Sequence, residues 1–261
     1  MSAPSEQAAQ TQTAGCYVYG IVPVDVELTA EVRGVGEPAG KVRLVRHDDI
    51  AAIASDIDID RPLGTPDDLT AHAEVLDKLA ASVPVLPVRF GSVLTGEDAV
   101  ADELLAPHHD EFVAALDELD GKAEYVVRSR FVEQAVLSEI LAENEAAGRL
   151  RERIHGLPEE VTRNERIQLG ELVTQAINEK REATVSELLE SVGEHAVASQ
   201  VREPGHEEDA AQVAFLIKNS DRDAFEQALE KQAGRWEGRV QVRLLGPVAA
   251  YDFVRTAGGG G

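Results

Sequence analysis

The apolar positions of the chain follow two patterns: short runs that alternate or are fully apolar, and longer runs that repeat every three or four residues. A period of two is typical of strands, and spacings of three and four are typical of helices that bury one face. The strand patterns cover residues 16–22, 41–46, 50–57, 83–94, 122–130, 197–201, 213–217 and 239–245. The helix patterns cover residues 65–81, 95–119, 132–154, 167–192 and 220–233. This mixture predicts an α+β protein, with a break or kink at Pro107 in the second helix.

Residues 83–94 form the densest apolar and β-branched run of the chain. We interpret this run as a mostly buried strand at a sheet edge, because Pro84 and Pro87 cannot donate a hydrogen bond to a neighbouring strand. Gly91 indicates a bulge or a close approach of the backbone. Arg89 lies in the middle of the run without a nearby acidic residue. A structural salt bridge is the preferred explanation for this arginine, and a contact with an anion or a partner is the alternative.

The predicted elements after residue 121 follow the order strand, helices, strand, strand, helix, strand. This is the order of a ferredoxin-like βαββαβ domain with an enlarged helical first crossover. The first half of the chain reads as a smaller α+β unit. We therefore predict two folded domains between a disordered leader and a flexible tail. The predicted bounds are 1–15 for the leader, 16–120 for the N-terminal domain, 121–255 for the ferredoxin-like domain and 256–261 for the tail.

Net charge is the most unusual property of the composition. The chain has 48 acidic and 25 basic residues, which gives a formal charge of −23. Such a field repels nucleic acids and anionic membranes, so neither is an expected partner. Acidic residues spread over the whole chain, with few lysines, are typical of proteins from a salt-rich cytoplasm. We therefore predict a halophilic source and partial unfolding in dilute buffer.

The location and redox state of the chain follow from simple counts. No apolar run approaches the length of a membrane span, and the N-terminus lacks the pattern of a secretion signal, so a cytoplasmic location is expected. The single cysteine, Cys16, excludes an intramolecular disulfide and a cysteine zinc cluster. We interpret Cys16 as a small buried apolar residue.

The sequence contains no recognisable catalytic or cofactor motif. A GxGxxG after a strand, a Walker-type GxxxxGK[ST], an HExxH and a GxSxG are all absent. Asp56, Asp58 and Asp60 share one face of an extended segment and could bind a hard cation, but solvated carboxylates are the preferred interpretation in so acidic a chain. We therefore predict no catalytic residue, no cofactor and no metal ligand.

Two aromatic pairs are candidates for a structural or a binding role. Tyr17 and Tyr19 share one face of the first predicted strand, and Tyr251 and Phe253 share one face of the terminal segment. Core or inter-domain packing is the preferred interpretation. The alternative is an exposed anchor for a partner protein, because aromatic residues are enriched in interface cores.

Four stretches resemble the GvpF/GvpL family of gas vesicle accessory proteins, in the order that the family has them. Residues 87–93 (PVRFGSV) resemble its PVRFG-[TS]-V segment, residues 17–22 (YVYGIV) its opening strand, and residues 214–217 (AFLI) an AFLV strand. Residues 246–254 (GPVAAYDFV) resemble the closing GPWPPYSFV, although Val-Ala-Ala replaces Trp-Pro-Pro. The resemblance extends from about residue 16 to residue 254.

The resemblance implies a non-enzymatic accessory or minor structural protein of gas vesicle assembly. Its expected partners are the hydrophobic major shell protein and other accessory proteins, in the cytoplasm or at the vesicle. The chain length and leader favour an L-type member of haloarchaeal kind. A ligand-sensing ferredoxin-like module and, less favoured, an α+β enzyme are the alternative functions. The candidate partner-binding or family-motif residues are Tyr17, Tyr19, Arg89, Phe90, Phe215, Tyr251 and Phe253.

Overall fold

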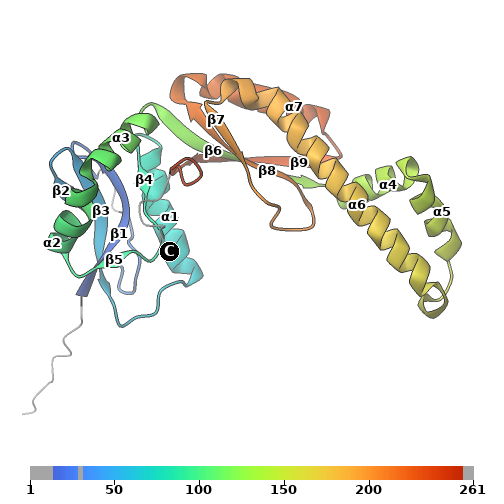
Figure 1. Ribbon diagram of the computed structural model, residues 1–261, viewed down its shortest axis with the longest axis horizontal. Helices are drawn as coiled ribbons and strands as arrows, with labels where there is room; N and C mark the ends of the chain where they lie inside the picture. Colours follow the sequence, from blue (N-terminus) through green and yellow to red (C-terminus); the bar gives the residue numbers. More distant parts are fainter. Residues whose placement is uncertain (1–13, 29–31, 255–261) are drawn as a thin grey trace, which may run out of the picture. The chain divides into compact units, whose positions relative to one another are not determined.

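The computed structural model describes residues 14–28 and 32–254. These residues form helices and two separate sheets, which confirms the α+β fold class (Figure 1). Residues 1–13 of the predicted leader and the predicted tail lie outside the described residues. The first strand begins at Ala14, so residues 14 and 15 belong to the sheet and not to the leader.

The chain divides into two compact units. Unit 1 holds the chain up to residue 123 and returns at residue 247, and unit 2 holds residues 124–246. The predicted domains, 16–120 and 121–255, stay a prediction, and residues 247–254 group with unit 1 and not with residues 124–246. The closing segment, residues 247–254, packs in unit 1, where the Ala249 N–H donates to Asp77 Oδ1 at 3.0 Å.

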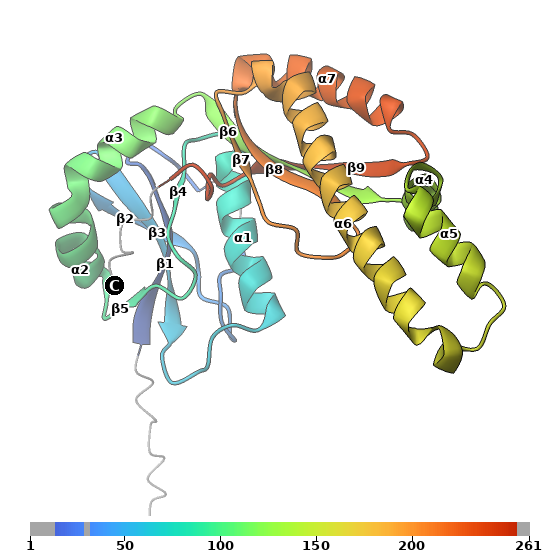
Figure 2. The same ribbon diagram turned by 45° about the vertical axis from the view of Figure 1, so that its right-hand side comes forward.

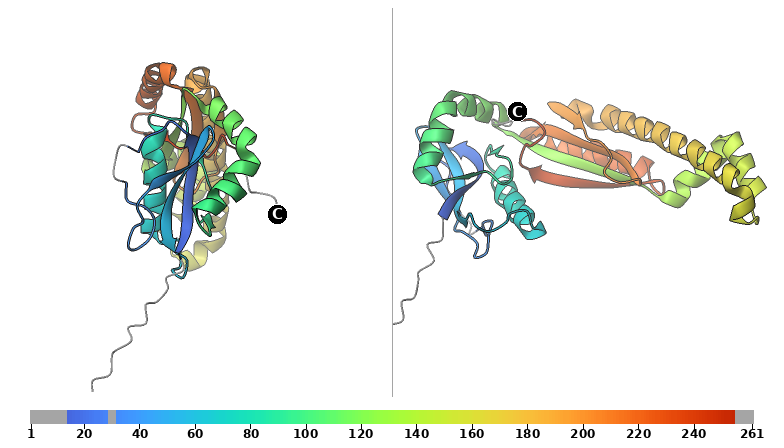
Figure 3. Two further views of the ribbon diagram at one scale, coloured as in Figure 1. Left: turned by 90° about the vertical axis from the view of Figure 1, so that its left-hand side faces the viewer. Right: turned by 60° about the horizontal axis from the view of Figure 1, so that its bottom comes forward.

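Unit 1 is a mixed layer structure around a five-stranded antiparallel sheet. The sheet order is β2-β3-β1-β4, and β5 also pairs with β1. The strands are β1 (Ala14–Pro23), β2 (Arg43–His47), β3 (Ile50–Asp58), β4 (Leu86–Pro87) and β5 (Val93–Leu94). Helices α1 (Pro66–Ala80) and α3 (His109–Leu119) cover opposite faces of this sheet (Figure 3). Between β5 and α3 lie α2 (Glu97–Ala99), the π-helix η1 (Val100–Leu105) and the 3₁₀ turn η2 (Ala106–His108), so the predicted break at Pro107 is confirmed.

A bulge in β1 controls which side chains reach each face. The register of β1 against β3 shifts between Val18 and Gly20, so that Tyr19 is the extra residue. Tyr17 and Tyr19 both face α1 by the normal alternation of a strand, and the bulge keeps Gly20 on that face as well. A Cβ on Gly20 would lie 2.7 Å from the Leu86 carbonyl oxygen and 2.8 Å from Leu76 Cδ2, so only glycine fits there.

The sequence predicts one continuous strand over residues 83–94, and this prediction is wrong, because the run contains two short strands. Only β4 and β5 are extended, and both pair with β1, with Ile21 opposite Leu86 and Tyr17 opposite Val93. Between them the chain loops out, since Pro87 has no N–H and Gly91 has a φ of 87°. The run therefore lies at the sheet edge, as predicted, but as two short pieces that flank a loop.

Unit 2 is built on a four-stranded sheet of order β7-β8-β6-β9. The strands are β6 (Lys122–Phe131), β7 (Ala198–Val201), β8 (Asp209–Lys218) and β9 (Val240–Val248). The helices are α4 (Glu133–Glu143), α5 (Glu145–Ile154), α6 (Glu159–Val192) and α7 (Arg222–Arg235), with the short 3₁₀ turns η3 (Gly193–His195) and η4 (Asn219–Asp221). In chain order the strands occupy sheet positions 3, 1, 2 and 4, which is the order of two interleaved βαβ halves. On this ground we propose that unit 2 is ferredoxin-like.

The helical insertion of unit 2 differs in detail from the expected pattern. The helix predicted at 132–154 is two helices, because Asn144 ends α4 and its side chain accepts the Ala147 N–H to cap α5. Helix α5 then runs beside the first half of α6 (Figure 2). The core under α7 contains Phe225, whose ring lies 5.2 Å from that of Phe215 and 6.4 Å from that of Tyr125.

Candidate interaction groove

Three of the four family-like stretches come together in unit 1. Residues 17–22 form the middle of β1, residues 87–93 begin at the end of β4 and form the loop after it, and residues 246–254 contain the closing segment. The fourth, residues 214–217, lies in β8 of unit 2 and is buried. Segments as far apart as residues 17 and 251 therefore form one local site, which the linear sequence does not reveal.

A chain of hydrogen bonds, buried at Tyr17 and His72 and partly exposed at Tyr251, joins these three stretches at His72 of α1. Tyr17 Oη lies 2.9 Å from His72 Nδ1, and Tyr251 Oη lies 2.7 Å from His72 Nε2. The Gly91 N–H donates to Tyr17 Oη at 3.1 Å. The Gly91, Tyr17 and His72 donors each have an acceptor when Tyr17 donates to Nδ1 and His72 donates from Nε2 to Tyr251. The His72 imidazole thus connects β1, the loop between β4 and β5, and the closing segment.

The surroundings of His72 keep this chain uncharged. Burial lowers the pKa of His72 from 6.5 to about 4, so the imidazole is neutral near pH 7. Burial also raises the pKa of the Tyr17 and Tyr251 phenols. The Tyr19 ring stacks on the imidazole with its centroid 5.6 Å away. These groups therefore act as a structural connection between neutral partners.

A second anchor holds the closing segment at Asp77, one and a half turns further along α1. Its carboxylate accepts the Ala249 N–H. Burial raises the pKa of Asp77, and the hydrogen bond from Ala249 partly offsets that rise. Because Asp77 and His72 hold the segment on both sides of Ala250, the direction of Phe253 and Val254 is fixed.

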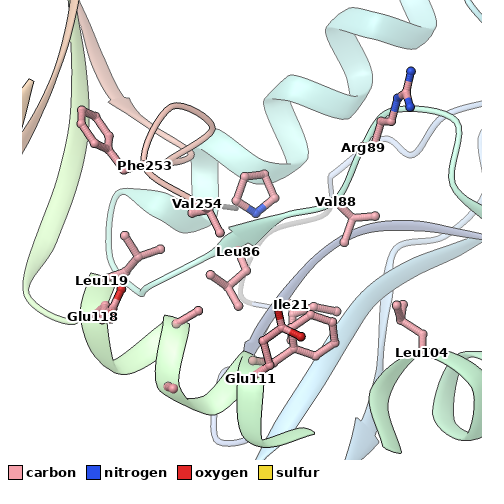
Figure 4. Close-up of a pocket in the computed structure, with 14 residues that line it drawn as sticks. Ile21, Leu86, Val88, Arg89, Leu104, Glu111, Glu118, Leu119, Phe253 and Val254 are labelled. Atoms are coloured by element: carbon pink, nitrogen blue, oxygen red, sulfur yellow. The ribbon is translucent and has the colours of Figure 1, made fainter. Parts of the chain in front are cut away.

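The closing segment completes one wall of an apolar groove on the α3 side of the sheet, with a cavity volume of about 390 Å³. We call it the motif groove. Figure 4 shows Phe253 and Leu119 at one end and Leu104 near the other, with Leu86 and Val88 between them. Its other apolar lining residues are Ile21, Pro87, Phe112, Ala114, Ala115 and Val254.

Charged groups lie only at the rim of the motif groove. Glu111 and Glu118 of α3 are on one side, and Arg89 is on the strand side, where its side chain points away from the apolar floor (Figure 4). Arg89 is exposed, and among the residues that the structure describes no ion pair includes it. The described residues thus provide no salt bridge for Arg89, and both the structural salt bridge and the contact with a partner stay predictions.

The other sequence candidates take different positions. Tyr17 and Tyr19 have no exposed surface, as the core interpretation of this pair expects, and the family-motif residue Phe215 is also fully buried. Phe90 is half-buried against the rings of Tyr17 and His72. Tyr251 and Phe253 lie in a turn and not in an extended segment, so they point to different places, His72 and the motif groove.

Sequence reasoning missed the residues that organise the site. His72 is not among the sequence candidates, and neither are Asp77 or the small residues Ala114 and Ala115. An isolated histidine on an apolar helix face is a signal for a buried polar connection, but its partners lie 55 and 179 residues away.

Groups of metal ligands and membrane-spanning helices were both expected to be absent, and the structure bears on them only for the residues that it describes. Within residues 14–28 and 32–254, no three His, Cys, Asp or Glu side chains are grouped so that they could hold a metal ion, and Asp56 instead pairs with Arg43 at 2.7 Å. None of the described helices has the length and apolar character of a membrane span. Cys16 is buried, which raises the pKa of its thiol.

Known proteins resemble the chain over nearly its whole length. The family model described as "Gas vesicle synthesis protein GvpL/GvpF" matches residues 15–255. Gas vesicle protein F of a Streptomyces species is 34% identical over 91% of this chain and 98% of that protein, and gas vesicle protein L of the same strain is 29% identical over 92% and 93%. The crystal structure of GvpF from an Anabaena species has a TM-score of 0.75 at 23% identity and covers 93% of this chain and 98% of that one. Relatives of both types match, so the L-type expectation stays a prediction.

Proposed function

The chain belongs to the GvpL/GvpF family of gas vesicle synthesis proteins and has a role in gas vesicle formation, in which we propose that it acts as a non-enzymatic adaptor. Its task in this proposal is to hold an apolar segment of the major shell protein, or of a fellow accessory protein, in the motif groove. It would do so in the cytoplasm, at the growing vesicle.

The observation that carries the proposal is the composition of the motif groove. Three family-like stretches contribute its floor and one wall, and charged groups are confined to the rim. An apolar floor with a charged rim is the usual character of a protein-binding surface. His72 and Asp77 fix the closing segment, so the groove is formed before the partner arrives and little ordering entropy is lost on binding.

The shape of unit 1 favours a helical occupant over an added strand. The neighbouring sheet edge at β4 has only two residues, and one of them is Pro87, which has no N–H. Such an edge offers a poor template for strand addition. A short amphipathic helix can instead place its apolar face on Leu86, Val88 and Leu119, in the helix-in-groove mode.

The test is to fill the motif groove without disturbing the core. In Ala115→Arg the new side chain enters the groove, and Glu111 and Glu118 lie one turn away on α3 to pair with it. We expect the variant to fold normally and to bind the major shell protein at least about tenfold more weakly in molar salt. Co-purification of the full-length chain with the shell protein, quantified by titration, measures this change.

Ala183→Arg is the matched control. Ala183 is exposed on α6 and also has acidic neighbours one turn away, Glu179 and Glu187, but it lies outside the motif groove. This variant should bind as the wild type does. Equal binding of wild type, Ala115→Arg and Ala183→Arg to the shell and accessory proteins would rule out the motif groove as the binding site.

A further inference from the structure

The two sheets differ in how their edges are protected against pairing with another chain. An open edge presents unpaired N–H and C=O groups, and proteins normally protect it with charges, proline or short length. In unit 1 the edge strand β2 carries Arg43 and Arg46, and β4 is short and contains Pro87. In unit 2 the edge strand β9 carries exposed Arg243 near its middle and Pro247 near its end.

Strand β7, at the other edge of the unit 2 sheet, is short, but it carries neither a charge nor a proline. All four of its residues, Ala198–Val201, are exposed, and Val201 is 45% exposed. Residues 196–201 contain no charged side chain and no proline, although 28% of the chain is charged. The residue that directly follows β7, Arg202, is charged, and its guanidinium is already paired with Glu124 at 3.0 Å.

The register of β7 shows which of its backbone groups are free to pair. Gln200 lies opposite Ala214 of β8, and the Arg202 N–H donates to the Gln212 carbonyl at 2.8 Å. In an antiparallel pair the hydrogen-bonded residues alternate, so Gln200 and Arg202 face β8 while Ser199 and Val201 turn their N–H and C=O groups outward. The Gln200 amide donates to the Val201 carbonyl oxygen at 3.4 Å, which is a weak local substitute for a missing strand.

We propose that β7 pairs antiparallel with β7 of a second copy of the chain, which joins two unit 2 sheets into one eight-stranded sheet. The register that joins the outward-facing groups of both strands places Ser199 opposite Val201 of the other copy and Gln200 opposite its own equivalent. Each copy then donates and accepts through Ser199 and Val201. This arrangement is self-complementary, as a two-fold dimer requires.

The charge of the chain favours a second copy as the occupant only where salt is high. Two chains of −23 repel each other, and acidic Glu182 of α6 lines the same pocket as Val201 of β7. Salt screens the repulsion between the two acidic chains. Because β7 itself is uncharged, the contact contains no ion pair that salt would weaken. The Debye length falls from about 10 Å at 0.1 M salt to about 3 Å at 1 M. Self-association should therefore strengthen as salt is raised, the opposite of an interface held by ion pairs.

Sedimentation of the full-length chain over a concentration series, at low and at molar salt, tests the proposal. We expect a monomer–dimer equilibrium whose Kd falls as salt rises. Ser199→Pro removes an outward N–H from each copy without touching the hydrogen bonds to β8. It should raise the Kd about thirtyfold, which corresponds to about 2 kcal/mol.

Two cross-checks separate loss of pairing from loss of fold. Val201→Lys places a charge in the contact and should abolish the dimer, whereas Val161→Lys makes the same change at a 70% exposed valine of α6 and should leave it intact. Gln200→Cys should form an intermolecular disulfide under oxidation, since directly opposed Cα atoms of a non-hydrogen-bonded pair lie about 4.5 Å apart. Ser220→Cys, also exposed, should form none at the same protein concentration.

A chain that stays monomeric at molar salt would overturn the proposal, and so would a dimer that Ser199→Pro and Val201→Lys leave unchanged. A monomer whose binding to the shell protein is lost in Ser199→Pro would show that β7 takes a strand of another protein instead. None of these outcomes depends on the motif groove, which Ala115→Arg tests separately.

Discussion

Units 1 and 2 each bring distant chain segments together, but they do so with different polar chemistry. Unit 1 joins its opening strand, α1 and closing segment through neutral hydrogen bonds at buried His72. Unit 2 joins α4, α6 and the turn before β9 through partly exposed ion pairs, with Glu139 shared by Lys180 and Arg239. A buried neutral connection is sensitive to protonation and little affected by salt, whereas exposed ion pairs are screened by salt. Two units of one fold class should therefore respond to different solution conditions.

The strongest expected effect tests whether the two cores are energetically separate. Phe215 of unit 2 is fully buried against Phe225, so Phe215→Ala should destabilise the protein by about 3–5 kcal/mol. Hydrogen exchange of the full-length variant should show lost protection in β6 and β8 and unchanged protection in β1 and β3. Phe215→Leu keeps most of the volume and should cost less than about 1.5 kcal/mol. Equal loss of protection in both units would contradict the separation.

The next effect is the pH dependence of unit 1. The folded pKa of His72 is about 4 and its ordinary value is 6.5, so between these values the unfolded chain binds a proton that the folded chain does not. Stability is thus full above pH 6.5 and falls as the pH drops to 4, by roughly 3 kcal/mol. Denaturant unfolding over this range measures the slope.

His72→Gln is the comparison variant for the pH profile. It is less stable near pH 7 because it loses part of the hydrogen-bond chain, but it has no group that titrates between pH 4 and 6.5 at this position. Its stability should therefore depend less on pH than that of the wild type, while the carboxylates contribute equally to both. Parallel pH profiles would show that His72 is not the group responsible.

The smallest expected effect is the stability that unit 2 loses when the ion pairs of one lysine are removed. Lys180 Nζ lies 3.0 Å from Glu139 and 2.8 Å from Glu143, and Lys180→Met should cost only about 0.5–1 kcal/mol. The loss should shrink as salt is raised from 0.1 M to about 1 M, because the pairs are then screened in the wild type. Unfolding of both proteins across this salt range measures it. A loss that does not change with salt would mean that packing of the lysine stem, and not its charge, stabilises α4 against α6.

Parts of the structure follow directly from local patterns. The α1 start was readable from Thr65, Pro66 and Asp68, and in the structure Thr65 and Asp68 form a capping box. The order of strands and helices after residue 121 is likewise as the hydrophobic periods indicate. The interrupted strand at residues 83–94 was not readable, because its two halves are extended only through their pairing with β1.

The sequence alone therefore determined the fold class, the main elements and the family resemblance, since each depends on residues close together in the chain. It also determined the charge that predicts salt-dependent behaviour. Only the tertiary structure decided that the closing segment returns to unit 1, that His72 joins residues 17 and 251, and that Arg89 is left at the rim of the motif groove. The physical reason is that a hydrogen bond or a groove wall depends on distance in space, and a pattern of neighbouring residues contains no information on which distant segments meet.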